Sequence, residues 1–362
     1  MNRTGSKNPR ARQRLLFVIS LLVLAGGAQS ACAQSAVAAT GGAEEGLSFR
    51  SGSNTLRGLL TLPEGVGPFP AIVLVSGSGD PSTGIRDGVA SPLHVEHARM
   101  LVRDGYAILR YDPPGVGGST GMPGFESLES RVEEAMGALR ALQSHPAVRA
   151  DRIGFLANSQ GAWVIQMAAA KYPRDVAFII TLSGSGVSVA EQQVYGIEMQ
   201  SRAGGLTEED VGKAVAFGRL LVDWQLDRPM FRDAEPGDAS RPAEGVLRRF
   251  RDLVYEPRGR DAAAAFGEGL AILREAEDET WARYLYLRMV VAQLETIPPE
   301  QVSLLKREAE KSLRTDPKDF LVDVHCPVLA FLSTRPDGSL FIGPLENLHV
   351  DGVFFHRRQV CH

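Results

Sequence analysis

The sequence predicts an α/β fold, in which a mostly parallel sheet carries helices on both faces. From residue 41 to about residue 187, short runs typical of strands alternate with helical patterns. Residues 71–75 are continuously apolar, as expected for a strand that is buried on both faces. The chain has 362 residues, of which 44% are hydrophobic and 23% charged, so it can form one large domain with an insertion, or two domains.

The other core elements are expected wherever apolar runs or amphipathic stretches are bounded by glycine, proline or polar residues. In chain order they are an antiparallel strand pair at 47–50 and 56–62, helix 92–103, strand 106–111, helix 128–143, strand 152–156, helix 162–171, strand 176–182 and, much later, strand 326–332.

A helical insertion is expected between residues 188 and 315, because strand-like runs vanish there and helical periodicity takes over. It would separate two core segments, 41–187 and 316–362. Residues 207–210 (TEED) resemble the capped start of a helix, and further helices are expected at 262–275 and 279–294. The insertion is either a lid over an active site or a peripheral ornament.

The first 33 residues are typical of a secretory signal peptide. Basic residues without any acid precede an apolar run at 15–25, and Ala31-Cys32-Ala33 supplies a small-residue cleavage site. The apolar run is short for a bilayer span. We therefore expect an exported protein, periplasmic or secreted, with no stable membrane insertion after cleavage. An uncleaved anchor and a lipidated Cys32 are the alternatives.

Composition and cysteine spacing limit the partners and cofactors. A net charge of −4 and a pI near 6.0 provide no basic surface, so we expect no nucleic-acid partner. The sequence has neither a C-x-x-C pair nor an H-E-x-x-H motif, so no metal and no cofactor are expected. After signal cleavage Cys326 and Cys361 remain. They either pair in an oxidising compartment or stay free thiols.

The strongest chemical signal is the segment 157–161 (ANSQG), which lies between a predicted strand and a predicted helix. A serine at such a turn takes a strained backbone conformation, so the residues two before and two after it must be small. Ala157 and Gly161 meet this requirement. The pattern predicts Ser159 as a nucleophile above the positive end of the following helix. The alternative is a serine that caps an ordinary helix.

Hydrolysis through a serine also requires N–H groups that bind the oxyanion. These groups commonly belong to the residue after the nucleophile and to the loop after the third strand. Gln160 is the first candidate, and Ser78, in the glycine-rich segment 76–79, is the second. An ordinary glycine-rich turn is the alternative for that segment.

These segments resemble bacterial esterases and serine-aminopeptidase-like hydrolases of the α/β-hydrolase superfamily. The resemblance rests on residues 75–80 (VSGSGD), 109–121 (LRYDPPGVGGSTG) and 153–161 (IGFLANSQG), and it covers about residues 47–187 and the strand at Pro327. It implies the α/β-hydrolase fold. Similar proteins read D-x-R-G-x-G-x-S in the second segment, whereas this chain has Pro114 in place of that arginine.

The resemblance also implies the chain order serine, acid, histidine for a catalytic triad. Asp337 is the acid just beyond the strand at 326–332, and His362 follows a β-like stretch at 352–355. His356 is the second choice for the base. Only 30 residues follow Leu332, fewer than the roughly 40 expected for the remaining elements. An incomplete or frame-shifted C-terminal end is therefore one hypothesis.

The sequence favours a serine hydrolase that cleaves a carboxylic ester of a small-molecule acyl substrate through an acyl-enzyme on Ser159. The first alternative is an exopeptidase-like amidase, in which Glu208 and Glu209 of the insertion would bind an amino terminus. The second is a non-catalytic remnant of the fold that lacks a complete triad.

Other chemically active side chains have simpler interpretations. His94 and His97 share a predicted helix face without a third metal ligand, which indicates a solvated or locally satisfied pair. Trp163, Trp224 and Trp281 either line an acyl pocket or pack in helical cores.

Overall fold

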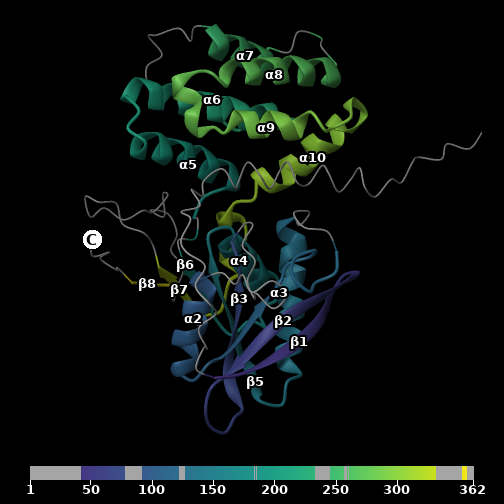
Figure 1. Cartoon of the computed structure of the whole chain (residues 1–362), viewed down its shortest axis with the longest axis vertical. Helices are drawn as coiled ribbons and strands as arrows, with labels where there is room; N and C mark the ends of the chain where they lie inside the picture. Colours follow the sequence, from purple (N-terminus) through teal and green to yellow (C-terminus); the bar gives the residue numbers. More distant parts are fainter. Residues whose placement is uncertain are drawn as a thin grey trace, which may run out of the picture. The chain divides into compact units, whose positions relative to one another are not determined.

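The computed structural model (Figure 1) describes most of the chain in two compact units. The described residues of Ser188–Thr315 form one unit, and those of Ser30–Val187 and Asp316–His362 form the other. The described residues are 42–77, 92–121, 127–182, 184, 186–232, 245–256, 259, 261–331 and 353–356.

The core unit is built on an eight-stranded sheet with the order β1-β2-β4-β3-β5-β6-β7-β8. The pairs β1–β2 and β2–β4 are antiparallel, and every other pair is parallel. The predicted, mostly parallel sheet is confirmed. Its strands are β1 (Ala43–Ser51), β2 (Asn54–Leu62), β3 (Phe69–Val75), β4 (Ala107–Tyr111), β5 (Val148–Asn158), β6 (Ile179–Leu182), β7 (Val328–Phe331) and β8 (Val353–His356).

Helices cover both faces of this sheet: α2 (Pro92–Arg103), α3 (Leu128–Gln143) and α4 (Gly161–Lys171). Figure 1 shows α2 and α3 on either side of the strands. Ile72 and Leu74 of β3 pack against α2 on one face of the sheet. The alternate residues Ala71, Val73 and Val75 point to the opposite face, where α3 and α4 contact β3, and they are buried as well. Burial on both faces explains why the strand reads as an unbroken apolar run. Two short 3₁₀ turns, Pro317–Asp319 and Leu321–Asp323, precede β7.

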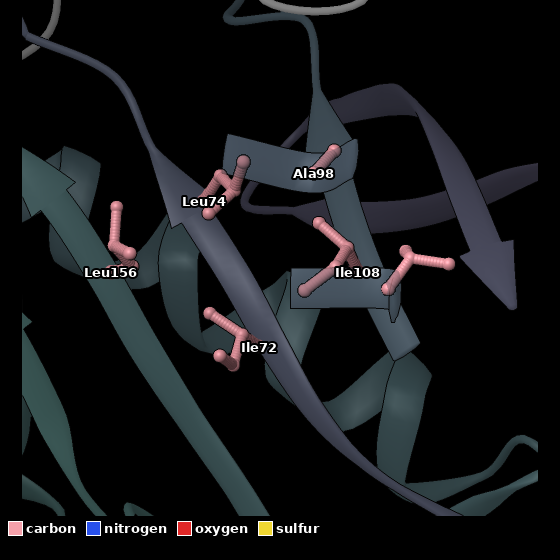
Figure 2. Close-up of a cluster of buried hydrophobic side chains, with 6 residues drawn as sticks. Ile72, Leu74, Ala98, Ile108 and Leu156 are labelled. Carbon is pink, nitrogen blue, oxygen red and sulfur yellow. The ribbon is translucent and has the colours of Figure 1, made fainter. Parts of the chain in front are cut away.

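The apolar cluster under α2 ties the central strands together. Figure 2 shows Ile72 and Leu74 of β3, Ile108 of β4 and Leu156 of β5 on the same side of the sheet as Ala98 of α2. Leu74 is 1% exposed. The cluster therefore holds side by side the strands whose carboxyl ends carry the predicted site.

The helical unit has an aromatic core. Trp224 stacks on Phe266 with ring centroids 5.3 Å apart, and Trp281 lies 5.1 Å from Phe217. Trp224 and Trp281 are therefore core-packing residues, the second of the two interpretations. The elements of this unit are α5 (Val189–Ala203), α6 (Glu208–Trp224), α7 (Gly245–Tyr255), α8 (Ala262–Ala276), a 3₁₀ helix (Thr280–Tyr284), α9 (Leu287–Leu294), a 3₁₀ turn (Pro299–Gln301) and α10 (Val302–Leu313).

The single helix expected at 279–294 is wrong. The structure has a 3₁₀ helix, Thr280–Tyr284, followed by α9, and the break between them falls at Tyr286 with φ +51°. A left-handed residue cannot continue a right-handed helix, so the helical pattern is interrupted there. The start predicted near Thr207 is confirmed, because its side chain accepts a hydrogen bond from the Asp210 N–H and α6 begins at Glu208.

Within the described ranges, we find no helix both long and apolar enough to cross a membrane. Residues 1–33, where the signal peptide is predicted, lie outside those ranges.

The cluster in Figure 2 gives the first prediction. Replacing Leu74 by Ala leaves a cavity beneath α2 and should lower the free energy of unfolding by about 3 kcal/mol, measured by urea denaturation. Val66→Ala is the control, because Val66 is 98% exposed, and it should leave the unfolding midpoint unchanged. Equal losses in the two variants would contradict the central role of the cluster.

Candidate active site

Ser159 occupies a sharp turn between the end of β5 and the start of α4, with a φ of +49°. Its N–H donates to the Leu182 carbonyl of β6 at 3.1 Å, and its own carbonyl accepts from the Ala162 N–H at 3.0 Å. A non-glycine residue in this left-handed region is strained, so the surrounding structure must hold it. The two backbone hydrogen bonds anchor the turn to the next strand and to the helix.

Gly161 shows why the turn needs small residues. A Cβ atom at this position would lie 2.7 Å from the carbonyl oxygens of Val75 and Ser76, and 3.1 Å from the Ala157 Cβ. Real Cβ atoms do not approach backbone oxygens that closely. The first turn of α4 therefore contacts the carboxyl end of β3 directly, and any side chain at residue 161 would push the two apart.

The chain after β3 lies against the turn at Ser159. A Cβ on Gly77 would be 3.4 Å from the Ser159 Cβ and 3.1 Å from the Asn158 Nδ2. The Gly77 N–H donates to the Asn158 Oδ1 at 3.2 Å. This amide is already engaged, so the next one along, that of Ser78, stays the predicted oxyanion donor. Ser78 itself lies outside the described residues.

Gln160 stands at the N-terminus of α4, where the first amides of a helix have no partner within the helix. Its side-chain oxygen accepts a hydrogen bond from the Arg131 Nη1 at 2.6 Å. The same guanidinium donates through Nη2 to the Ser76 carbonyl. Arg131 is 8% exposed and comes from the first turn of α3. The sequence analysis did not single it out, because nothing in the local pattern distinguishes it from a surface arginine.

His94 also belongs to this neighbourhood. It is 1% exposed, and its Nε2 lies 3.3 Å from the Asn158 Oδ1, which also accepts from the Gly77 N–H. The solvated interpretation is therefore wrong for His94, because α2 packs over the sheet and buries this side chain. Burial, together with the nearby His94, lowers the pKa of His97.

The predicted acid and base lie outside the described part of the chain. Asp337 and His362 both fall there. His356 is the last residue of β8, and its backbone pairs with Phe331 of β7. A strand at this point agrees with the β-like stretch expected at 352–355. Both triad assignments stay predictions.

The two acids that would bind an amino terminus under the exopeptidase-like alternative have basic partners within the helical unit. Glu208 forms an ion pair with Arg202, and Glu209 lies 2.9 Å from the Lys213 Nζ. In the described ranges, no group of three or more histidine, cysteine or acidic side chains could hold a metal ion. Cys326 is a free, half-buried thiol, and Cys361 lies outside those ranges.

Comparison with known proteins gives one family match. The family model described as serine aminopeptidase, S33, matches residues 88–239, which include the turn at Ser159. No curated protein matches.

Solved structures similar to this chain share little sequence with it. Proline iminopeptidase from Mycobacterium smegmatis is 15% identical over 86% of this chain and 89% of its own, with a TM-score of 0.44. The α/β hydrolase GrgF from Penicillium sp. sh18 is 19% identical over 80% and 79%, with a TM-score of 0.42. Est1E from Butyrivibrio proteoclasticus, solved with ferulic acid, is 16% identical over 79% and 77%, with a TM-score of 0.40.

The close approach at Gly161 gives the second prediction. Gly161→Ala should lower the free energy of unfolding by about 1 to 3 kcal/mol, because the new Cβ displaces backbone rather than a flexible side chain. The measurement is urea denaturation followed by tryptophan fluorescence. Gly212→Ala in α6 is the matched control, since its Cβ would meet no atom within 4 Å, and it should stabilise the helix slightly. A Gly161→Ala variant as stable as this control would rule out the proposed crowding.

Proposed function

We propose that this chain belongs to the α/β-hydrolase superfamily and is a serine hydrolase that cleaves a carboxylic ester through an acyl-enzyme on Ser159. The observation that carries the proposal is the left-handed backbone of Ser159 at the carboxyl end of the central strand β5. A serine that merely caps a helix has extended backbone angles. Here the position before α4 is held by Gln160, in helical conformation and without a side-chain cap. The strain at Ser159 is instead typical of a nucleophile turn.

The proposed reaction has two halves. The Ser159 Oγ attacks the acyl carbon while its proton passes to a histidine base, for which His362, oriented by Asp337, is our assignment. The carbonyl oxygen becomes an oxyanion, which the N–H groups of Gln160 and Ser78 would stabilise. The bond to the alcohol then breaks, and the alcohol leaves with the proton from the histidine. In the second half water attacks the acyl-enzyme by the same route and releases the carboxylic acid.

Ester cleavage is preferred over the exopeptidase-like alternative for a specific reason. That alternative needs a carboxylate available for an amino terminus, and both Glu208 and Glu209 already form ion pairs with basic residues of their own unit. The basic and apolar composition of residues 1–33 supports export, so we place the activity in the periplasm or outside the cell. The expected substrate is a small acyl ester.

A fluorophosphonate probe tests this proposal, because it phosphonylates only an activated serine. The purified protein should be labelled, and Ser159→Ala should abolish labelling and lower p-nitrophenyl acetate hydrolysis by about 10⁵- to 10⁶-fold. Ser144→Ala is the control, since its hydroxyl is exposed and donates only to the Arg140 carbonyl. It should label and hydrolyse like the parent.

The outcomes separate the alternatives. Hydrolysis of aminoacyl p-nitroanilides in preference to esters would favour the exopeptidase-like function. A folded parent protein without any labelling would indicate the non-catalytic remnant. His362→Ala and His356→Ala, assayed in parallel, would show which of the two histidines is the base.

A further inference from the structure

One peptide unit beside Ser159 is held from both sides. The Ser76 carbonyl accepts a hydrogen bond from the Arg131 Nη2, and the N–H of the same peptide, that of Gly77, donates to the Asn158 Oδ1 at 3.2 Å. The carbonyl and N–H of a trans peptide point in opposite directions, so bonds at both ends determine how its plane is turned. Glycine accepts a wide range of backbone angles, so without these bonds the peptide could rotate at little cost.

The other terminal nitrogen of the Arg131 guanidinium contacts Gln160, on the opposite side of Ser159 in the sequence from Asn158. This nitrogen, Nη1, donates to the Gln160 Oε1 at 2.6 Å. Gln160 carries the first proposed oxyanion donor, and the Ser76–Gly77 peptide lies beside Ser159 just after β3. One guanidinium therefore links the residue that carries this donor to the segment that follows β3.

The chemistry of arginine suits this role. Its guanidinium is planar and presents several N–H groups in a fixed arrangement, so two acceptors bound to it are held at a set separation. Arg131 is buried, and its backbone N–H donates to the carbonyl of Ser127, whose side chain caps α3 through the Ser130 N–H. Because the start of α3 is anchored in this way, the guanidinium has a stable base from which to act.

We propose that Arg131 is a positioning residue that holds Gln160, which carries the first proposed oxyanion donor, and the Ser76–Gly77 peptide in a fixed arrangement beside Ser159. It acts through the Gln160 side chain and the Ser76–Gly77 peptide, not by contact with the substrate. This inference rests on the proposed serine hydrolase function. A direct oxyanion donor contributes about 10²- to 10³-fold to kcat, and misaligned donors lose part of that factor.

The test compares Arg131→Met with Arg140→Met, both on α3. The side chain of Arg140 is exposed and lies over the Tyr172 ring at 5.5 Å, far along the helix from the turn. Active sites are counted with the fluorophosphonate, so kcat is expressed per reactive Ser159. We expect kcat of Arg131→Met to fall about tenfold or more, with KM within about threefold of the parent. Arg140→Met should match the parent in both values.

A second readout separates positioning from general structural damage. A trifluoromethyl ketone forms a tetrahedral adduct with the serine and places a negative oxygen in the oxyanion site. Its binding should weaken in Arg131→Met by a factor similar to the loss in kcat. A role confined to stability would lower the number of labelled sites and leave both values per site unchanged, and that result would overturn the proposal.

Gln160→Met covers the case in which Arg131→Met does not fold. It removes one acceptor of the guanidinium while it keeps the backbone N–H of residue 160, and it should lower kcat in the same direction. If both single variants fold, the double variant should lose less than the product of the two single losses, because both changes break one linkage. Unchanged kcat per site in Gln160→Met would overturn the linkage through that side chain.

These outcomes also distinguish the two proposals. An active, labelled parent with an equally active Arg131→Met refutes only the role of Arg131. A parent that is neither labelled nor active refutes the proposed function, and the role of Arg131 with it.

Discussion

The first turn of α4 and the end of β3 approach so closely that Gly161 has no room for a side chain. Its missing Cβ would lie 2.7 Å from the Val75 and Ser76 carbonyl oxygens. This contact brings the chain after β3 against Ser159 and gives the guanidinium of Arg131 two acceptors within reach. If the two segments moved apart, the left-handed turn at Ser159 would lose its support.

The sheet makes that approach possible. β3 and β5 are parallel neighbours, with Val75 opposite Ala157, so both strands end at the same edge. The carboxyl edge of a parallel sheet is the usual place for a site in α/β proteins, because loops and helix starts converge there. The apolar cluster on Ile72 and Leu74 holds this register against α2. A closely packed apolar interior below this edge stabilises the sheet, so that a strained residue can persist at the edge.

Two buried polar side chains, Arg131 and His94, and the half-buried Asn158 lie close to Ser159. Arg131, Asn158 and His94 each make contacts with residues distant in sequence. Buried polar atoms are costly unless they are hydrogen-bonded, and once bonded they fix orientation more sharply than apolar packing does. In the helical unit, aromatic rings such as Trp224 and Phe266 form the core, and the buried Asp223 is likewise hydrogen-bonded.

The sequence by itself determined the strand and helix pattern of the core, because a buried face of a strand or helix places apolar residues at regular intervals in the sequence. Helices 92–103 and 128–143 are found with the expected bounds. It also determined the sharp turn at Ser159, since the strand, the serine with its small neighbours and the helix are contiguous in the chain. The helix expected at 279–294 failed because the left-handed Tyr286 has no local sequence signature.

Only the tertiary structure decided which distant residues surround the serine. Arg131, His94 and Gly77 come from three different segments. Arg131 lies 29 residues from Gln160 in the sequence, and His94 and Gly77 lie 64 and 81 residues from Asn158. No local pattern of apolar and polar residues predicts such contacts, because they depend on how the parallel strands are ordered in the sheet. The strand order β4-β3-β5 places these segments together, and that order is a property of the folded chain alone.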